Sequence, residues 1–111
     1  MGVTKSNLFT DEQNETALFA KAFSHPARVA ILQYLIKKNA CINGDLVQEL
    51  GLAQATISQH LRELKDIGII QGSIEGSRIS YCINPLSWEK IKGRFNDLFN
   101  QIEVPSNKEC C

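Results

Sequence analysis

The amino-acid sequence predicts a mostly α-helical domain that carries a single β-hairpin. Through most of the chain, apolar residues recur at spacings of three and four, which is typical of helices that pack on one face. Between Ile69 and Ile83 the period changes, and two short runs rich in β-branched residues flank a turn that contains glycine. The length of 111 residues predicts one domain. We expect an arm over residues 1–9, a body over 10–103 and a flexible cysteine-containing tail over 104–111.

Local start and stop signals place the first two helices. Thr10 and Gln13 have the spacing of a capping box, so the first helix is expected to begin there. This helix is apolar on more than one side, which predicts burial against both its own core and a second subunit. Ser24 is expected to cap the second helix, with Pro26 in its first turn. The second helix is predicted to end near Lys38, where a cationic side chain complements the helix dipole.

A tight pair of helices follows. Asn43 is expected to begin a short third helix and Gly51 to end it. After a very short turn, the fourth helix is predicted over Gln54–Ile67, because its apolar residues recur by four, three and three. Gly68 then suits a left-handed helix stop. Two short helices joined by a tight turn and followed by a hairpin indicate a winged helix-turn-helix.

The outward face of the fourth helix is polar and uncharged near its N-terminus. Such side chains can hydrogen-bond to base edges in the major groove of DNA. An arginine at the tip of the hairpin can reach a phosphate or the minor groove. His60 is interpreted as a phosphate contact or a packed ring, and His25 as a helix-start residue. The alternative is an ordinary solvated surface. The predicted DNA contacts are Gln54, Ala55, Thr56, Ser58, Gln59, His60, Arg62 and Arg78.

The last helix, predicted over residues 86–102, carries a wide and aromatic apolar stripe. This stripe exceeds what a small core needs, so we interpret it, together with the first helix, as a homodimer interface. Packing within one chain is the alternative. The expected interface residues are Leu18, Phe19, Trp88, Ile91, Phe95, Leu98, Phe99 and Ile102.

Composition and motifs limit the classes of function that this protein can have. The formal net charge is zero, which mildly disfavours nucleic acid and leaves open a winged helix that binds protein instead. An enzyme is least favoured, because the sequence has no Cys-x-x-Cys pair, no Gly-rich phosphate loop and no evident nucleophile–base set. We expect no required cofactor. Residues 1–15 lack an apolar signal region and no run is long enough to span a membrane, so we expect a cytoplasmic protein.

Two stretches of the sequence resemble those of a known protein family. Ser24–Leu32 and Glu49–Gly68, with the hairpin residues 76–78 and Tyr81, resemble the ArsR/SmtB family of bacterial winged-helix repressors. The resemblance implies a homodimer whose two recognition helices enter successive major grooves of a near-palindromic operator in double-stranded DNA. It also implies an inducer, often a metal or metalloid ion. One departure is Ala53, where relatives often have a Ser cap, and its absence is expected to cost about 1 kcal/mol.

The sequence identifies the inducer less clearly than it identifies the family. The family's paired-cysteine arsenic motif is absent, because Ile42 and Gly44 occupy its positions, and the last helix has no His for the family's zinc site. Thiolates favour As(III), Sb(III) or other thiophilic ions. The main hypothesis is a metalloid inducer, and the alternatives are reversible oxidation by oxidants or reactive sulfur, or inert thiols. The candidate ligands are Cys110 and Cys111 with a third thiol from Cys41 or Cys82.

Overall fold

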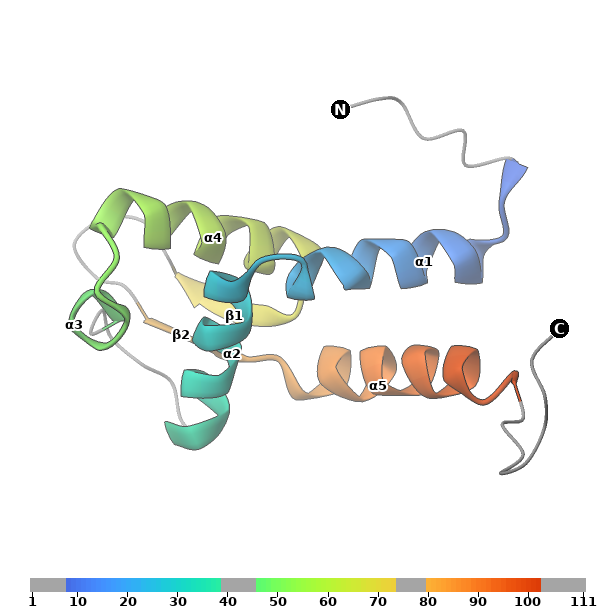
Figure 1. Cartoon of the computed structure of the whole chain (residues 1–111). Helices are drawn as coiled ribbons and strands as arrows, with labels where there is room; N and C mark the ends of the chain where they lie inside the picture. The colour runs from blue at the N-terminus through green and yellow to red at the C-terminus, as the bar shows by residue number, and fades with distance from the viewer. Residues whose placement is uncertain (1–7, 39–45, 74–79, 103–111) are drawn as a thin grey trace, which may run out of the picture.

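The computed structural model describes residues 8–38, 46–73 and 80–102 (Figure 1). It confirms a mostly helical fold with one antiparallel strand pair. In chain order the elements are α1 (Asp11–Ala20), the 3-10 helix η2 (Lys21–Phe23), α2 (Pro26–Lys38), α3 (Leu46–Leu50), α4 (Gln54–Ile67), β1 (Ile70–Ser73), β2 (Ser80–Ile83) and α5 (Pro85–Phe99). No helix in these described ranges is long and apolar enough to cross a membrane.

The start of α1 follows the sequence prediction. The Thr10 hydroxyl accepts a hydrogen bond from the Gln13 amide at 3.0 Å, and the Thr10 amide donates to the Gln13 side-chain oxygen at 2.9 Å. This reciprocal pair is the expected capping box. After Ala20 the chain tightens into η2, which the sequence patterns did not separate from the first helix.

The cap of α2 corrects a sequence prediction. Ser24 does not cap this helix, since its hydroxyl donates to the Lys21 carbonyl at 2.8 Å. His25 caps it instead: its Nδ1 accepts a hydrogen bond from the Ala27 amide at 3.0 Å. The reason is positional, because Pro26 is the first helical residue and the cap is the residue directly before it. The interpretation of His25 as a helix-start residue is thereby confirmed.

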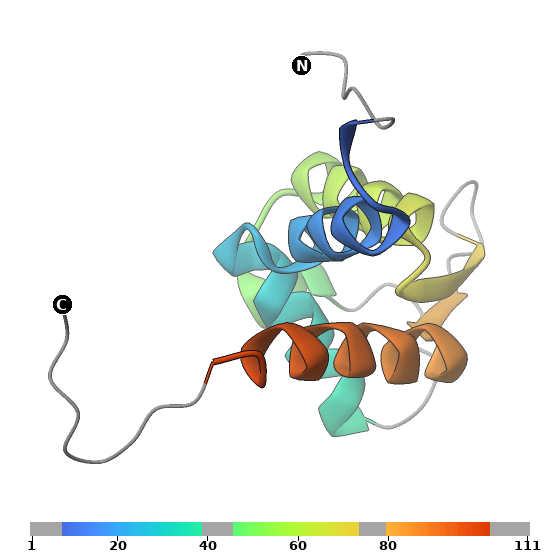
Figure 2. The same ribbon diagram turned by 90° about the vertical axis from the view of Figure 1, so that its right-hand side faces the viewer.

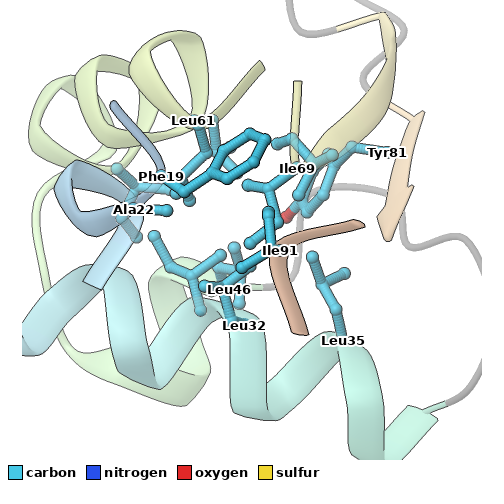
Figure 3. Packing of buried hydrophobic residues seen from close by; sticks show 13 residues of the cluster. Phe19, Ala22, Leu32, Leu35, Leu46, Leu61, Ile69, Tyr81 and Ile91 are labelled. Atoms are coloured by element: carbon cyan, nitrogen blue, oxygen red, sulfur yellow. The ribbon is translucent and has the colours of Figure 1, made fainter. Parts of the chain in front are cut away.

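The core forms where α2, α4, the strand pair and α5 converge (Figure 3). One face of α4 enters this core through Ile57, Leu61 and Leu64, which fixes the opposite face outward. β2 contributes the largest fully buried side chain, Tyr81. The cluster consists of Phe19, Ala22, Ile31, Leu32, Leu35, Leu46, Ile57, Leu61, Leu64, Ile69, Ile70, Tyr81 and Ile91.

Two glycines shape the connection from α4 into the strand pair. Gly68 ends α4 in the left-handed region at φ 98°, as the sequence predicted. Gly72 also has a positive φ of 127°, and a Cβ there would lie 2.0 Å from the Ser80 carbonyl oxygen. Only glycine therefore allows β1 to approach β2 in this register. The predicted turn over residues 75–77 and the predicted outer ends of both strands lie outside the described residues.

α1 and α5 lie side by side, as both ribbon views show (Figures 1 and 2). The Glu15 carboxylate joins them, accepting from Arg94 Nε at 2.6 Å and pairing with Lys90 Nζ at 2.8 Å. The hydrogen bonds from Lys90 and Arg94 lower the pKa of Glu15. α5 begins at Pro85 and ends at Phe99, so the predicted helical end at residue 102 was three residues too far.

Candidate nucleic-acid interface

The N-terminal half of α4 presents a polar surface to solvent. Gln54, Ala55, Thr56 and Gln59 are exposed, and Arg62 continues this face toward the C-terminal half. Because the apolar face of the same helix is buried in the core, these side chains cannot rotate inward without exposing the core. The structure thus places five of the predicted contact residues on one outward surface, which we call the recognition face.

Ser58 lies at the edge of the recognition face and is half-buried. Its hydroxyl accepts a hydrogen bond from Gln54 Nε2 at 3.0 Å. This bond links residues one helical turn apart and limits the rotamers of Gln54. Ala53, at the cap position, contributes no side-chain hydrogen bond, as expected. The first turn of α4 therefore keeps the amide groups and partial positive charge that favour an anion such as a DNA phosphate.

His60 is placed differently from the rest of the predicted contacts. Its ring is half-buried, its Nδ1 accepts a hydrogen bond from Arg28 Nε at 3.2 Å, and its centroid lies 4.6 Å from that of His25. Burial lowers the pKa of His60, and the charges of His25 and Arg28 lower it further. These contacts favour the packed-ring interpretation over the phosphate contact.

Arg28 is a residue whose role the sequence patterns did not reveal beyond its positive charge. Its side chain is only 11% exposed and pairs with the Glu63 carboxylate of α4. Besides its charge, the sequence signals were its place two residues after Pro26, in the first turn of α2, and its position within the stretch Ser24–Leu32. Its partner His60 stands 32 residues away, so no local spacing predicts the contact.

In the strand pair, β1 packs against α4 and β2 packs against α2, and Tyr81 of β2 is buried in the core. Cys82, its neighbour on β2, is half-buried and has a free thiol. The Gln71 side-chain amide lies 3.9 Å from the Cys82 sulfur. Arg78, the predicted contact at the tip, lies outside the described residues, so its role stays a prediction.

The other three cysteines, Cys41, Cys110 and Cys111, also lie outside the described residues. Within residues 8–38, 46–73 and 80–102, no three His, Cys, Asp or Glu side chains converge in a way that could hold a metal ion. Convergence of the four thiols therefore stays a prediction.

The expected dimer residues divide into two groups. Phe19 and Ile91 are only 6% and 3% exposed and belong to the chain's own core. Their assignment to an interface is corrected, because α1 and α5 pack against the rest of the chain and direct these side chains inward. Trp88 and Phe95 are half-buried and pack against the same core. Leu18, Leu98, Phe99 and Ile102 stay exposed, as an interface requires.

Phe23 extends this exposed group and was not among the predicted interface residues. Its ring meets those of Trp88 and Phe95 edge-to-face, at centroid distances of 6.4 and 6.1 Å. These rings border a shallow depression of about 320 Å³ on the surface of α5. The residues Phe23, Leu98, Phe99 and Ile102 are called the apolar face below, whereas the exposed Leu18 borders a separate depression beside Arg28 and Asp66.

Comparison with known proteins agrees with this architecture. The family model described as bacterial regulatory protein, arsR family, matches residues 25–71, which contain the helix-turn-helix. The HTH-type transcriptional regulator YgaV of Escherichia coli is 36% identical over 69 residues, covering 62% of this chain and 70% of YgaV. The biofilm growth-associated repressor of Xylella fastidiosa is 36% identical over 58 residues, covering 52% of this chain and 50% of that repressor. The match thus spans half the length of the latter relative.

Similarity to a solved structure extends over more of the chain. The crystal structure of NolR from Sinorhizobium fredii is 26% identical, with a TM-score of 0.60, and the match covers 89% of this chain and 96% of NolR. That coverage exceeds the segment matched by the family model, so the helices outside the helix-turn-helix are shared as well. The chain therefore belongs to the ArsR family of bacterial regulatory proteins and has the winged helix-turn-helix of a DNA-binding transcription regulator.

Proposed function

We propose that this protein is a transcriptional repressor that binds a near-palindromic operator as a homodimer and is released by a thiophilic inducer such as As(III). The observation that carries the DNA-binding part is the recognition face of α4, held outward by the buried residues Ile57, Leu61 and Leu64. Its Gln and Thr side chains are groups that hydrogen-bond to base edges. The similar protein of Xylella fastidiosa is named as a repressor, which supports the direction of regulation.

The apolar face supports the homodimer. Phe99 and Ile102 are 64% and 70% exposed at the end of the chain's helical body, and Leu98, which directly precedes Phe99, is 45% exposed. A second copy of this chain is the natural partner, because an isologous interface lets the same apolar surface cover itself. Such a dimer would present two copies of α4 to half-sites about 34–36 Å apart.

The inducer part of the proposal rests on thiol chemistry. Four cysteines are present, and thiolates bind soft ions such as As(III) and Sb(III). Cys110 and Cys111 are the proposed first ligands, with Cys41 or Cys82 as the third. A redox switch through oxidants or reactive sulfur uses the same thiols, and it differs in that a reductant would restore DNA binding after induction.

Specific recognition by α4 makes a first prediction. Gln59→Ala is expected to weaken cognate operator binding by about 1–3 kcal/mol while changing affinity for random DNA little, because the amide reads a base edge. Thr56→Ala should act in the same direction. The measurement is fluorescence anisotropy on operator and random duplexes. Gln33→Ala, which removes an exposed glutamine from α2, is the matched control and should change neither affinity.

Arg78→Ala is expected to lower the affinity for the operator and the random duplex equally, because a phosphate contact does not depend on the base sequence. If Gln59→Ala leaves specific binding unchanged, the recognition face is wrongly assigned. The competing function, a winged helix that binds only protein, requires no phosphate contacts. A steep fall of DNA affinity with salt excludes that function, because counterion release depends on such contacts.

Induction makes a second prediction. Titration of the reduced protein with As(III) is expected to release it from its own upstream DNA in the same anisotropy assay. The double variant Cys110→Ser/Cys111→Ser should keep DNA affinity and lose the response to As(III). A redox inducer would instead give release by oxidant that dithiothreitol reverses. Operator binding that As(III) never disturbs removes the metalloid from the proposal and leaves the repressor.

A further inference from the structure

One arginine joins three separate parts of the chain beside the recognition helix. Arg28 Nη1 donates to the Lys21 carbonyl of η2 at 2.7 Å and lies 3.5 Å from Ser24 Oγ. Its Nε donates to His60 Nδ1 of α4 at 3.2 Å. Its Nη2 pairs with the carboxylate of Glu63, also on α4. A single planar guanidinium thus ties η2 and α2 to α4.

The hydrogen-bond geometry favours one protonation state of the His60 ring. His60 Nδ1 accepts from Arg28, so the ring is neutral with its proton on Nε2. His25 Nδ1 likewise accepts, from the Ala27 amide. The two rings lie 4.6 Å apart with an interplanar angle of 48°, so a charge on either would face the other ring and the Arg28 guanidinium. The arrangement is therefore compatible with a neutral His60 and opposed to a protonated one.

We propose that Arg28 and His60 form a clamp that sets the position of the recognition helix, and that His60 acts through Arg28 rather than by contacting DNA. The inference rests on the proposed function, because it concerns how α4 is presented to the operator. Both residues are positioning residues in this scheme. The clamp is defined as Arg28 with its two partners on α4, His60 and Glu63.

The geometry of the clamp explains why it would control orientation. His60 and Glu63 are three residues apart on α4, so Arg28 contacts neighbouring positions on one side of the helix. Two contacts from one rigid planar group resist rotation of the helix about its axis, whereas a single contact would not. A lysine could not replace Arg28, because its ammonium is a point charge without this fork of donors. Gln59 directly precedes His60, so rotation at the clamp moves the recognition face.

Protonation of His60 should open the clamp. An added proton on Nδ1 would face the Arg28 Nε–H and replace a hydrogen bond by repulsion between two cations. The ionisable groups around the ring are His25 before α2, Arg28 on α2 and Glu63 on α4, with Lys21 of η2 joined through its carbonyl. Because the pKa of His60 is lowered in the folded protein, the neutral clamp persists near neutral pH and is lost as the pH falls through that lowered value.

The test compares the operator affinity of wild type and His60→Asn at about pH 7.5 and at a series of lower pH values that ends where imidazole NMR shows His60 to be protonated. The Asn side-chain oxygen can occupy the place of Nδ1 and accept from Arg28, but it does not titrate. Wild type is expected to lose about tenfold in affinity relative to His60→Asn as the pH falls, the scale of one charge-assisted hydrogen bond. In His60→Gln the side-chain amide reaches the Nε2 position instead, so this variant should bind the operator more weakly than wild type at every pH.

Arg28→Lys is expected to weaken operator binding about tenfold at neutral pH, although the positive charge is kept. Circular dichroism confirms that each variant is folded. A wild-type affinity that rises on acidification, with no rise in His60→Asn, would overturn the clamp and make His60 a phosphate contact. Equal pH profiles of wild type and His60→Asn would also overturn it.

A DNA-independent measurement separates this inference from the proposed function. Nitrogen NMR of the imidazole reports whether Nδ1 is unprotonated at neutral pH, and whether Arg28 Nε–H is protected until His60 titrates. These signals support the clamp even if wild type binds no operator, in which case only the proposed function fails. A protonated Nδ1 at neutral pH contradicts the clamp whatever the DNA affinity.

Discussion

Leu64→Ala is expected to lower the free energy of unfolding by about 2–5 kcal/mol, the usual cost of truncating a buried leucine. Leu64 is 0% exposed and packs in the core from the inner face of α4. The substitution removes buried apolar surface and leaves a cavity between α4 and its neighbours. Urea unfolding followed by the fluorescence of Trp88 measures the effect.

Leu86→Ala is the matched control, because the same atoms are removed from a side chain that is 83% exposed. We expect it to change the free energy of unfolding by less than about 0.5 kcal/mol, as surface substitutions usually do. An equal loss in both variants would mean that α4 does not pack in the core as described. That result would also remove the basis for the recognition face.

Phe99→Glu is expected to convert the proposed homodimer to a monomer at micromolar concentration. Phe99 is 64% exposed on the apolar face, and its ring stacks on Phe95 at a centroid distance of 5.8 Å. A carboxylate at that position would be desolvated without a partner in a dimer, which should weaken dimerisation by about a hundredfold or more. Analytical ultracentrifugation measures the state of association, and operator affinity should fall with it, because a monomer presents only one α4.

Gln101→Glu is the control for charge alone, since it adds the same carboxylate at an exposed polar position two residues away. It should remain a dimer. A Phe99→Glu variant that stays dimeric and keeps full operator affinity would show that the apolar face is not the interface. The monomer should stay folded, because Phe99 lies outside the buried core cluster.

Local signals in the sequence determined much of the fold. The capping box at Thr10, the left-handed Gly68 and the apolar spacing of Gln54–Ile67 all lie within a few residues, and the structure confirms each of them. The order of helices and strands followed from the change of hydrophobic period. These features are readable from the chain because a helix or strand is stabilised by neighbours in sequence.

The recognition face follows from the same local logic. Once Ile57, Leu61 and Leu64 are buried, the helical period places Gln59 and Arg62 outward. The resemblance of the sequence to the ArsR family was confirmed by the family model and the relatives. The individual contacts with DNA and the role of the cysteines remain predictions, because they concern partners outside the chain.

Only the tertiary structure decided which apolar and charged side chains of different helices and strands contact one another. Phe19 and Ile91 looked like interface residues because a helical stripe does not reveal whether its partner is the same chain or another one. Packing of α1 and α5 against the core placed both inward. The contact between Arg28 and His60 joins residues 32 positions apart, and its existence depends on how α2 and α4 cross. Sequence spacing carries no information about such a crossing, since the contact forms only after both helices have packed.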